Sequence, residues 1–288
     1  MMPWLESVPA SQVVLAAMNE VIGSDWRTGL EDAQLRSKNS FSQPLITGTA
    51  LAAWAALVDG LDEPPKVVAG YSVGELPAYA CAGVFSAQTA IHLAVQRAEL
   101  MDDAVAGLDT GLLSVSGMSV TQVLQIQPTL DCAIEIGKQH AIYAGETSTL
   151  KVTAEVLLKL GAVCKPLDVR VASHSHWMDS AAKGFAAKLE ALPFSKPNAT
   201  LVLNSTGTST RELHTLRRAL SAQISATVQW GACMDVIAEH SVACVLEIGA
   251  GNTLAKMLRQ LHPAVPVRSI GEFHDVTGTV QWLRKQSL

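Results

Sequence analysis

The segment KVVAGYSVGELPAYACAG, residues 66–83, constrains the fold of this chain most strongly. A short β-branched run leads into Gly70-Tyr71-Ser72-Val73-Gly74, and a helix-like segment follows. Such a sharp turn from strand to helix is typical of the nucleophile elbow, in which a serine hydroxyl is exposed at the end of a strand. A turn that only needs glycines would leave the same pattern. Ser72 is therefore a candidate nucleophile that needs support from other residues.

Strands and helices alternate along the chain, but the middle differs from the two ends. Residues 11–60 are expected to be mostly helical, and the segments after residue 66 and after residue 177 alternate strand and helix. This alternation predicts an α/β protein whose parallel sheet is covered on both faces. Residues 112–170 are predicted in the order β-α-β-β-α-β, with a hairpin around Gly137-Lys138-Gln139, which is the order of a ferredoxin-like unit. We therefore expect a core of residues 1–111 and 171–288 and a small inserted subdomain between them.

The composition argues against a nucleic-acid partner and against a membrane-spanning segment. The chain of 288 residues has a net charge of −5, and its 21 lysines and arginines form no dense block. A nucleic-acid partner is not expected, because phosphate neutralisation needs clustered positive charge. No apolar run reaches the roughly 20 residues of a spanning helix, and no signal pattern precedes a cleavage site. We expect a cytoplasmic protein without a membrane partner.

The five cysteines support the same compartment. They are odd in number, widely spaced and without a C-x-x-C pair, which indicates a reducing cytosol rather than a disulfide framework or a zinc knuckle. Each lies in an apolar run and is expected to be buried. No metal-ligand cluster and no tightly bound cofactor are predicted.

A serine nucleophile needs a base within hydrogen-bond reach. The segment VRVASHSHWM (169–178) is predicted to end a strand, which places His174 and, less favoured, His176 where active-site groups of open α/β sheets gather. A conventional hydrolase would instead place an acid and a histidine late in the chain, and the pairs Asp235 with His262 and Glu247 with His274 are weaker candidates.

Two further features leave alternatives open. Arg97 interrupts an apolar helix stripe, so it is either a solvated residue or a partly buried guanidinium that faces a carboxylate. The run Gly249-Ala250-Gly251-Asn252 lacks the full dinucleotide-binding pattern, because Leu254 stands where the last glycine belongs, and a structural turn is favoured.

Five motifs in register resemble the malonyl-CoA:acyl-carrier-protein transacylases, the acyltransferase family of fatty-acid and polyketide synthesis. The resemblance covers about residues 40–260. Its motifs are GYSVGELPAYACAGVFS, VQRAELMDDAV, VASHSHWM, AQISATVQW and LEIGAGNTL. It implies an α/β-hydrolase-like core that carries an inserted ferredoxin-like subdomain.

The resemblance also implies roles for individual residues. Ser72 would be the nucleophile and His174 the general base. Arg97 would bind the free carboxylate of a malonyl group, the main-chain carbonyl of Gln223 would orient the histidine, and the backbone N–H of Val73 would be an oxyanion donor. The implied reaction moves a malonyl group from malonyl-CoA to the phosphopantetheine-type thiol of an acyl carrier protein.

Departures from the family pattern refine this expectation. Tyr71 replaces the histidine before the nucleophile, Ala98 the glycine after the arginine, and Thr227 and Ala250 replace two prolines. The G-Y-S-V-G-E variant resembles the acyltransferase (epsilon) subunit of biotin-independent malonate decarboxylase, which implies that complex's carrier subunit and other subunits as partners. We favour this member over a transacylase of fatty-acid synthesis.

The start of the chain leads to a further expectation. The family's first strand and its F-P-G-Q-G loop, which supplies a second oxyanion donor, are expected to be missing before MMPWLESVPA. Either the true start lies upstream, which we favour, or the activity is impaired. A serine hydrolase or thioesterase and a truncated non-catalytic subunit are the remaining alternatives.

Overall fold

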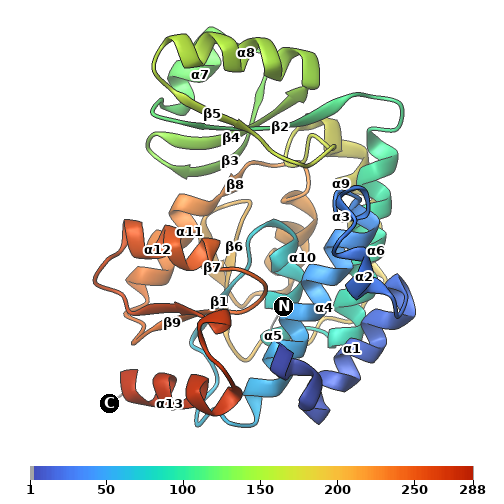
Figure 1. The fold of residues 1–288 in the computed structure, drawn as a ribbon, viewed down its shortest axis with the longest axis vertical. Coiled ribbons are helices and arrows are strands. Elements are labelled where there is room, and N and C mark those ends of the chain that lie inside the picture. Colours follow the sequence, from blue (N-terminus) through green and yellow to red (C-terminus); the bar gives the residue numbers. More distant parts are fainter. Residues whose placement is uncertain (1–2, 288) are drawn as a thin grey trace.

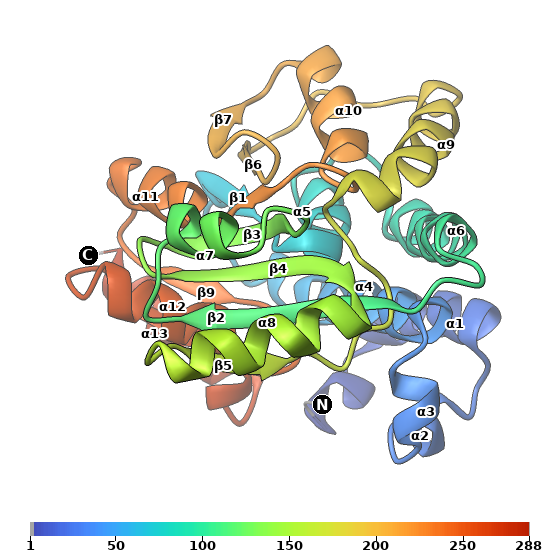
Figure 2. The same cartoon turned by 90° about the horizontal axis from the view of Figure 1, so that it is seen from above.

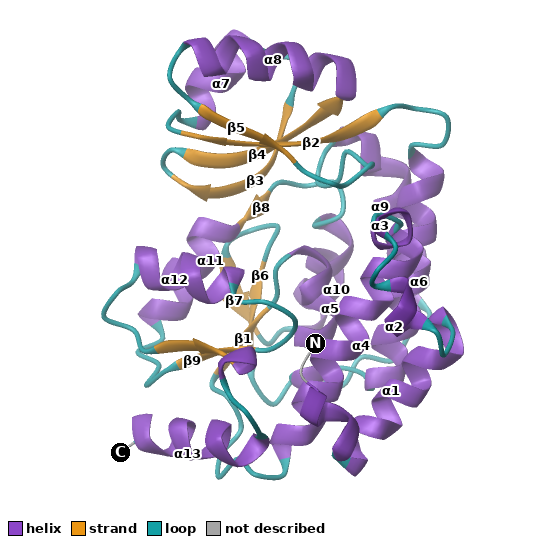
Figure 3. Ribbon diagram, in the orientation of Figure 1, coloured by secondary structure: helices purple, strands orange, loops and turns teal. Residues whose placement is uncertain are grey.

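The computed structural model describes residues 3–287 and consists of two stacked parts (Figure 1). A smaller part, made of one sheet with two helices on its outer face, lies above a larger part in which helices surround short strands (Figure 3). The sheet of the smaller part faces the larger part (Figure 1). Both termini belong to the larger part.

The N-terminal region is helical, as predicted. Its elements are η1 (Pro3–Ser7), α1 (Pro9–Ile22), α2 (Trp26–Gly29), α3 (Ala33–Arg36) and α4 (Asn39–Val58). α4 packs against α1 and α6 and carries many of the buried alanines of the core. Among residues 3–287, α4 is the one helix that could span a membrane by length and composition, contrary to the prediction that no apolar run reaches that length, but 67% of its most apolar window is buried inside the protein. Its apolar surface is therefore used in helix packing.

The core strands pair in parallel as predicted, but they form two small sheets. β1 (Val67–Ala69) pairs in parallel with β6 (Thr200–Leu203), which pairs antiparallel with β7 (Thr208–Thr210). β9 (Val245–Glu247) pairs in parallel with β10 (Val267–Ser269). β1 and β9 are half-buried, and in the part of the chain that the structure describes no strand pairs with the second edge of either. Helices alone precede β1 among residues 3–66.

Helices cover the core strands on both sides. Val67, Ala69 and Val245 belong to one hydrophobic cluster with residues of the two helices α11 and α12, so both sheets lie beneath the same helical layer. The remaining helices of the core close the other side and the ends. The helical elements are η2 (Ser72–Gly74), α5 (Glu75–Cys81), α6 (Ala87–Ala104), η3 (His176–Met178), α9 (Asp179–Glu190), α10 (Leu213–Ala222), α11 (Trp230–Glu239), α12 (Thr253–Leu261), η4 (Ile270–Glu272) and α13 (Val276–Gln286).

The smaller part has the element order predicted for residues 112–170. It consists of β2 (Thr110–Ser116), α7 (Val120–Ile126), β3 (Asp131–Gly137), β4 (His140–Glu146), α8 (Thr147–Lys159) and β5 (Val163–Pro166). β3 and β4 form the predicted hairpin, and α7 and α8 lie on the sheet face that points away from the core (Figure 2). The domain limits at residues 112 and 170 stay our proposal.

A strand of the core extends the sheet of the smaller part. β8 (Val228–Gln229) pairs in parallel with β3, which gives the strand order β5-β2-β4-β3-β8. Thr227, which stands where the family has proline, donates its hydroxyl to the Cys132 carbonyl 2.7 Å away. Residues 227–229, which come from far along the chain, thereby tie the two parts together, and a local sequence pattern does not reveal this.

Two predictions about local structure are wrong. The strand predicted over residues 164–171 ends at Pro166, so His174 does not follow a strand; residues 167–175 form irregular backbone between the two parts. The cysteines are all free, but Cys233 alone is fully buried, and the other four are half-buried. An apolar run predicts the environment of a cysteine but not its depth.

Gly70 and Gly74 offer a matched test of the turn after β1. A Cβ at Gly70 would lie 1.9 Å from the Gly74 carbonyl oxygen, whereas one at Gly74 would meet nothing within 4 Å. We expect Gly70→Ala to lower the free energy of unfolding by about 3 kcal/mol or more, because a backbone clash cannot relax cheaply. Gly74→Ala is the control and should change it by less than about 1 kcal/mol. Urea unfolding measures both, and equal effects would contradict this description of the turn.

Candidate active site

Ser72 occupies the turn between β1 and α5 in the conformation expected of a nucleophile elbow. Its φ of +53° lies in the left-handed region, which is strained for a residue with a side chain. Because Gly70 has no Cβ, the end of the turn can approach its start closely. The Gly74 N–H donates to the Tyr71 carbonyl at 2.9 Å and closes the turn. Tyr71 packs edge-on against Trp230, with ring centroids 5.1 Å apart. The turn holds the Ser72 hydroxyl half-buried at the end of β1.

His174 lies directly beside Ser72. The distance between Ser72 Oγ and His174 Nε2 is 2.7 Å, although 102 residues separate them. His174 Nδ1 lies 2.5 Å from the Gln223 carbonyl oxygen, which only accepts hydrogen bonds, so Nδ1 carries the proton and Nε2 has the free lone pair. The His174 backbone N–H is held by the Ile224 carbonyl, and its φ of +59° is again left-handed. The ring is therefore fixed in the tautomer that accepts a proton from the hydroxyl.

The surroundings keep the His174 ring neutral. The pKa of His174 is lowered to about 3, chiefly by burial and in addition by the positive charge of Arg97, while the hydrogen bond to Gln223 opposes this shift. A carboxylate in place of the Gln223 carbonyl would raise the pKa of the ring. The neutral carbonyl orients the base without making it cationic.

The Arg97 side chain extends from α6 toward the Ser72 hydroxyl. Its side chain is 1% exposed, and Nη2 lies 3.4 Å from both Ser72 Oγ and the Gln223 side-chain oxygen. Nη1 donates to the Gln43 side-chain oxygen of α4 at 2.6 Å. Arg97 takes part in none of the ion pairs found among residues 3–287. A guanidinium is thus buried beside the nucleophile without a carboxylate bonded to it.

Glu75 lies close enough to influence Arg97 without being bonded to it. This carboxyl group is fully buried in the first turn of α5, and burial raises its pKa to about 8 despite the opposing effects of the Asn204 N–H and the Arg97 charge. Glu75 is therefore mostly protonated at neutral pH. Burial also lowers the pKa of Arg97 to about 10, which leaves the guanidinium positively charged. The site carries one positive charge and no formal counter-charge.

Unpaired buried atoms surround the same space. Arg97 Nε, Glu75 Oε2 and Gln223 Nε2 are buried and have no hydrogen-bond partner in the described chain. Buried polar groups are normally paired, so such a group of atoms indicates a place for a polar ligand or ordered water. The residues described form no group of three or more His, Cys, Asp or Glu side chains that could hold a metal ion.

The other candidate residues lie elsewhere. His176 is exposed and bonds to Asp131 of the smaller part through Nδ1 at 2.5 Å. Asp235 and His262 do pair, at 2.9 Å, but on the surface between α11 and α12. The Glu247 carboxylate accepts from the first N–H groups of α12, so it caps that helix. The run 249–252 is the structural turn between β9 and α12.

Three residues of the site were missed in the sequence. Gln43 and Glu75 each form part of the arrangement around Arg97, and Asn204, described below, bonds to the turn. Gln43 could have been noticed as a polar residue in the apolar run of α4. Asn204 directly follows a buried strand, which is a position where functional residues collect.

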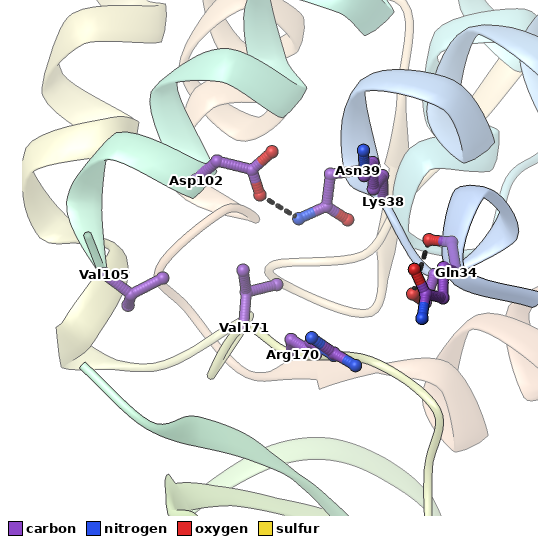
Figure 4. Close-up of a pocket in the computed structure, with 8 residues that line it drawn as sticks. Gln34, Lys38, Asn39, Asp102, Val105, Arg170 and Val171 are labelled. Carbon is purple, nitrogen blue, oxygen red and sulfur yellow. Dashed lines mark hydrogen bonds between the residues drawn. The ribbon is translucent and has the colours of Figure 1, made fainter. Parts of the chain in front are cut away.

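A pocket of about 360 Å³ lies where the end of α6, the start of α4 and residues 170–171 meet (Figure 4). Asn39 Nδ2 donates to Asp102 Oδ1 at 2.7 Å across its wall. Lys38 and Arg170 lie at its rim, and Val105 and Val171 line it. Ser72, Arg97 and His174 are not among the residues that line this pocket.

The neutral His174 ring leads to a prediction about stability and pH. An unfolded histidine has a pKa near 6.5, so between about pH 6.5 and 3 the unfolded chain binds this proton and the folded chain does not. Stability is therefore lost as the pH falls through this window. Between about pH 6.5 and 5 we expect this group to cost about 2 kcal/mol in the free energy of unfolding.

His174→Gln tests this prediction, with the exposed His92→Gln as control. Urea unfolding at the two pH values should show the loss in the native protein and in the control but not in His174→Gln. An equal loss in all three proteins would show that His174 titrates normally.

Solved structures with this fold are known. The chain matches MCAT from Mycobacterium tuberculosis with a TM-score of 0.86 and 29% identity, over 96% of this chain and 93% of that one. It matches the acyl-carrier-protein S-malonyltransferase from Bartonella henselae with a TM-score of 0.90 at 22% identity, over 99% and 95% of the two chains. The second match shows the fold alone. The α/β fold is thus that of known acyltransferases, as the resemblance implied.

Similarity in sequence extends over nearly the whole chain. The malonyl CoA-acyl carrier protein transacylase of Mycolicibacterium smegmatis is 31% identical over 288 residues, which cover 97% of this chain and 99% of the relative. The protein of that name from Mycobacterium tuberculosis is 31% identical over 274 residues, which cover 93% and 90%. The family model described as acyl transferase domain matches residues 5–283. The chain belongs to the acyl transferase domain family.

Proposed function

We propose that this protein transfers a malonyl group from malonyl-CoA to the thiol of an acyl carrier protein. The observation that carries the proposal is the buried Arg97 guanidinium, which lies 3.4 Å from the Ser72 hydroxyl and is bonded to no carboxylate. An unpaired buried charge is costly, so a site that keeps one is suited to a ligand with the opposite charge. In a malonyl thioester a single methylene group separates the free carboxylate from the reactive carbonyl.

In the first half-reaction Ser72 Oγ attacks the thioester carbonyl of malonyl-CoA. Its proton passes to His174 Nε2, 2.7 Å away, as the C–O bond forms. The C–S bond then breaks, and His174 returns the proton to the departing coenzyme A thiolate. Ser72 is left as a malonyl ester whose carboxylate can pair with Arg97.

The second half-reaction uses the same residues in the opposite direction. His174 Nε2 takes the proton of the carrier's phosphopantetheine-type thiol, and the thiolate attacks the Ser72 ester. The ester C–O bond breaks, and His174 returns the proton to Ser72 Oγ. The Gln223 carbonyl holds the ring throughout by accepting from Nδ1, and we propose the Val73 N–H as a donor to the oxyanion in both halves. No bound cofactor takes part in these steps.

Relatives support the choice of acceptor. Several curated relatives are transacylases between malonyl-CoA and acyl carrier protein by name, and one solved structure with this fold pairs a malonyl-transacylase with its type II polyketide acyl-carrier protein. We propose an acyl carrier protein as the partner of this chain also. The free cysteines and the absence of a basic block fit a cytoplasmic protein without a nucleic-acid partner.

We propose further that the acceptor is the carrier subunit of a biotin-independent malonate decarboxylase. Tyr71 in the elbow supports this assignment, and its ring packs against Trp230 of the closing motif. A transacylase of fatty-acid synthesis fits the same site equally well, because both reactions use the same acyl donor and a thiol of the same kind. Loading assays with the two carrier proteins separate them.

Two other candidates are disfavoured by specific contacts. A serine hydrolase or thioesterase would use Ser72 and His174 but has no need of a buried guanidinium beside them. A non-catalytic subunit has no need of a serine and a histidine held in left-handed backbone at hydrogen-bond distance. The first argument rests on the cost of burying the guanidinium, and the second on the backbone strain at the serine and the histidine.

The central prediction concerns Ser72. Incubation with malonyl-CoA should add one malonyl group to the intact protein, visible by mass spectrometry, and Ser72→Ala should abolish this adduct because no other group replaces the nucleophile. Ser114→Ala is a matched control, because Ser114 Oγ also lies near a histidine nitrogen, at 3.2 Å from His140. Labelling that survives in Ser72→Ala would refute the proposed nucleophile.

The second prediction concerns acyl selectivity. Arg97→Ala should lower the loading rate with malonyl-CoA by roughly ten- to a hundredfold, the worth of a charge-assisted hydrogen bond. Loading with acetyl-CoA, which has no second carboxylate, should change far less. The control Arg217→Ala removes an arginine that donates to the main-chain carbonyls of Leu189 and Leu192 at the end of α9, and should affect neither donor selectively. Equal losses on both donors in Arg97→Ala would refute the carboxylate contact.

A further inference from the structure

Asn204 connects the end of β6 to the turn that holds Ser72. Its side-chain oxygen accepts from the Ser72 N–H at 2.7 Å, and its Nδ2 donates to the Gly70 carbonyl at 2.6 Å. Its own main chain is used as well, since the N–H donates to Glu75 Oε1 at 2.8 Å and the carbonyl accepts from the Gln229 N–H at 2.8 Å. The residue is fully buried. Asn204 thus bonds to Gly70 before the turn, to Ser72 within it and to Glu75 after it.

The side-chain amide of Asn204 does what a neighbouring strand would do if β1 continued. β1 and β6 are paired up to Ala69 and Val202, and beyond this point the turn leaves the sheet. A single amide offers one donor and one acceptor side by side, which match the Gly70 carbonyl and the Ser72 N–H. Alanine would satisfy neither group, aspartate would place a negative oxygen against the Gly70 carbonyl, and glutamine is one methylene too long for a site without free space. Asparagine alone fits these two contacts.

Glu75 makes the same connection from the other side. It is the first residue of α5, and its Oε1 holds the Asn204 N–H, so the helix that follows the turn is bonded to the residue that supports the turn. Both residues are fully buried, which means that no water can replace these bonds if one is removed. Neither Asn204 nor Glu75 bonds to His174 or Arg97 directly among the hydrogen bonds described.

We propose that Asn204 is a positioning residue for the nucleophile, which fixes Ser72 in its left-handed conformation and so sets the 2.7 Å contact with His174. The Ser72 conformation, with φ of +53°, is costly for a residue with a side chain and persists only where surrounding bonds define it. Without the bond to its N–H, Ser72 can relax toward ordinary backbone angles, and its Oγ then moves away from Nε2. This inference rests on the proposed role of Ser72.

A purely structural role makes a different prediction. If Asn204 only satisfies buried main-chain groups, its loss should lower stability and leave the nucleophile as reactive as before in the molecules that are folded. Tyr79→Phe provides the comparison, because the Tyr79 hydroxyl of α5 donates to the buried Leu216 carbonyl at 2.9 Å and bonds to nothing in the turn. That variant also loses a buried hydrogen bond of the core but does not touch the elbow.

The experiment measures Ser72 reactivity in two ways in folded protein. A fluorophosphonate probe reports the nucleophile without any acyl substrate, and single-turnover loading reports the rate at saturating malonyl-CoA. Asn204→Ala should lower both rates about a hundredfold, as a misplaced reacting group does, with little change in the KM for malonyl-CoA. Tyr79→Phe should keep both rates. Labelling of folded Asn204→Ala at the native rate, or an equal loss in Tyr79→Phe, would overturn the inference.

Asn204→Asp supplies a second test within one protein, and it applies even when Asn204→Ala does not fold. A protonated carboxyl has one donor and one acceptor, like the amide, whereas the ionised form has no donor for Gly70. The labelling rate of Asn204→Asp, relative to that of the native protein, should therefore rise by at least about tenfold from about pH 8 to about pH 5.5. His174 stays neutral in this range, and Glu75, which accepts from the Asn204 N–H and has a pKa of about 8, is present in both proteins, so the ratio to the native rate corrects for its titration. A ratio independent of pH would overturn the inference.

The two readouts also separate this inference from the proposed function. If the native protein takes up no malonyl group but the probe labels Ser72 with the predicted dependence on Asn204, the malonyl assignment fails and the positioning role stands. If malonyl loading occurs at Ser72 and neither rate depends on Asn204, the positioning role fails and the proposed function stands.

Discussion

The hydrogen bond from His174 Nδ1 to the Gln223 carbonyl oxygen is the contact on which the site depends. It fixes the tautomer, so that Nε2 faces Ser72 Oγ at 2.7 Å with a free lone pair. Because the acceptor is a neutral carbonyl, the ring gains direction without a counter-charge, and burial can keep it uncharged. The Ile224 carbonyl holds the main chain of the same residue, so two neighbouring carbonyls after α10 define the whole position of the base.

The electrostatics of the site follow from the neutrality of this base. Glu75 is mostly protonated and His174 is uncharged, so Arg97 is the one formal charge at the nucleophile, and Gln43 and Gln223 surround it with neutral amides. A charge that is desolvated but not neutralised raises the free energy of the empty site, and an anionic acyl group removes that cost when it binds. The carboxylate selectivity that we propose therefore depends on two features of the site: the buried Arg97 charge, and the lack of a carboxylate bonded to it.

The sequence predicted those parts of the structure that depend on local pattern. The elbow at Ser72, the alternation of strands and helices and the element order of the smaller part can be read from neighbouring residues, because turn chemistry and periodicity act over a few positions. Arg97 was found among the candidates because it interrupts an apolar run, and His174 because it lies in a segment of small residues that was expected to end a strand. Their roles, and that of Val73, stay predictions.

Contacts between distant segments could not be predicted in the same way. The pairing of β8 with β3 joins segments about ninety residues apart, and the division of the core strands into two sheets depends on which edges meet. The same holds for Asn204, whose partners Gly70 and Ser72 lie far before it in the chain. Even the favoured base was placed for the wrong local reason, since His174 lies in irregular backbone held by Gln223 and Ile224 and not at the end of a strand.

The most direct test of the account is the fate of a malonyl group already bound to the protein. Protein loaded with malonyl-CoA and freed of excess donor should be mixed with a carrier protein that bears the phosphopantetheine-type arm, and both the carrier and free malonate should be followed over time. The account predicts that the malonyl group appears on the carrier thiol in an amount equal to the loaded enzyme, while release to water is slow without the carrier. Release of free malonate at the same rate with and without the carrier would contradict it.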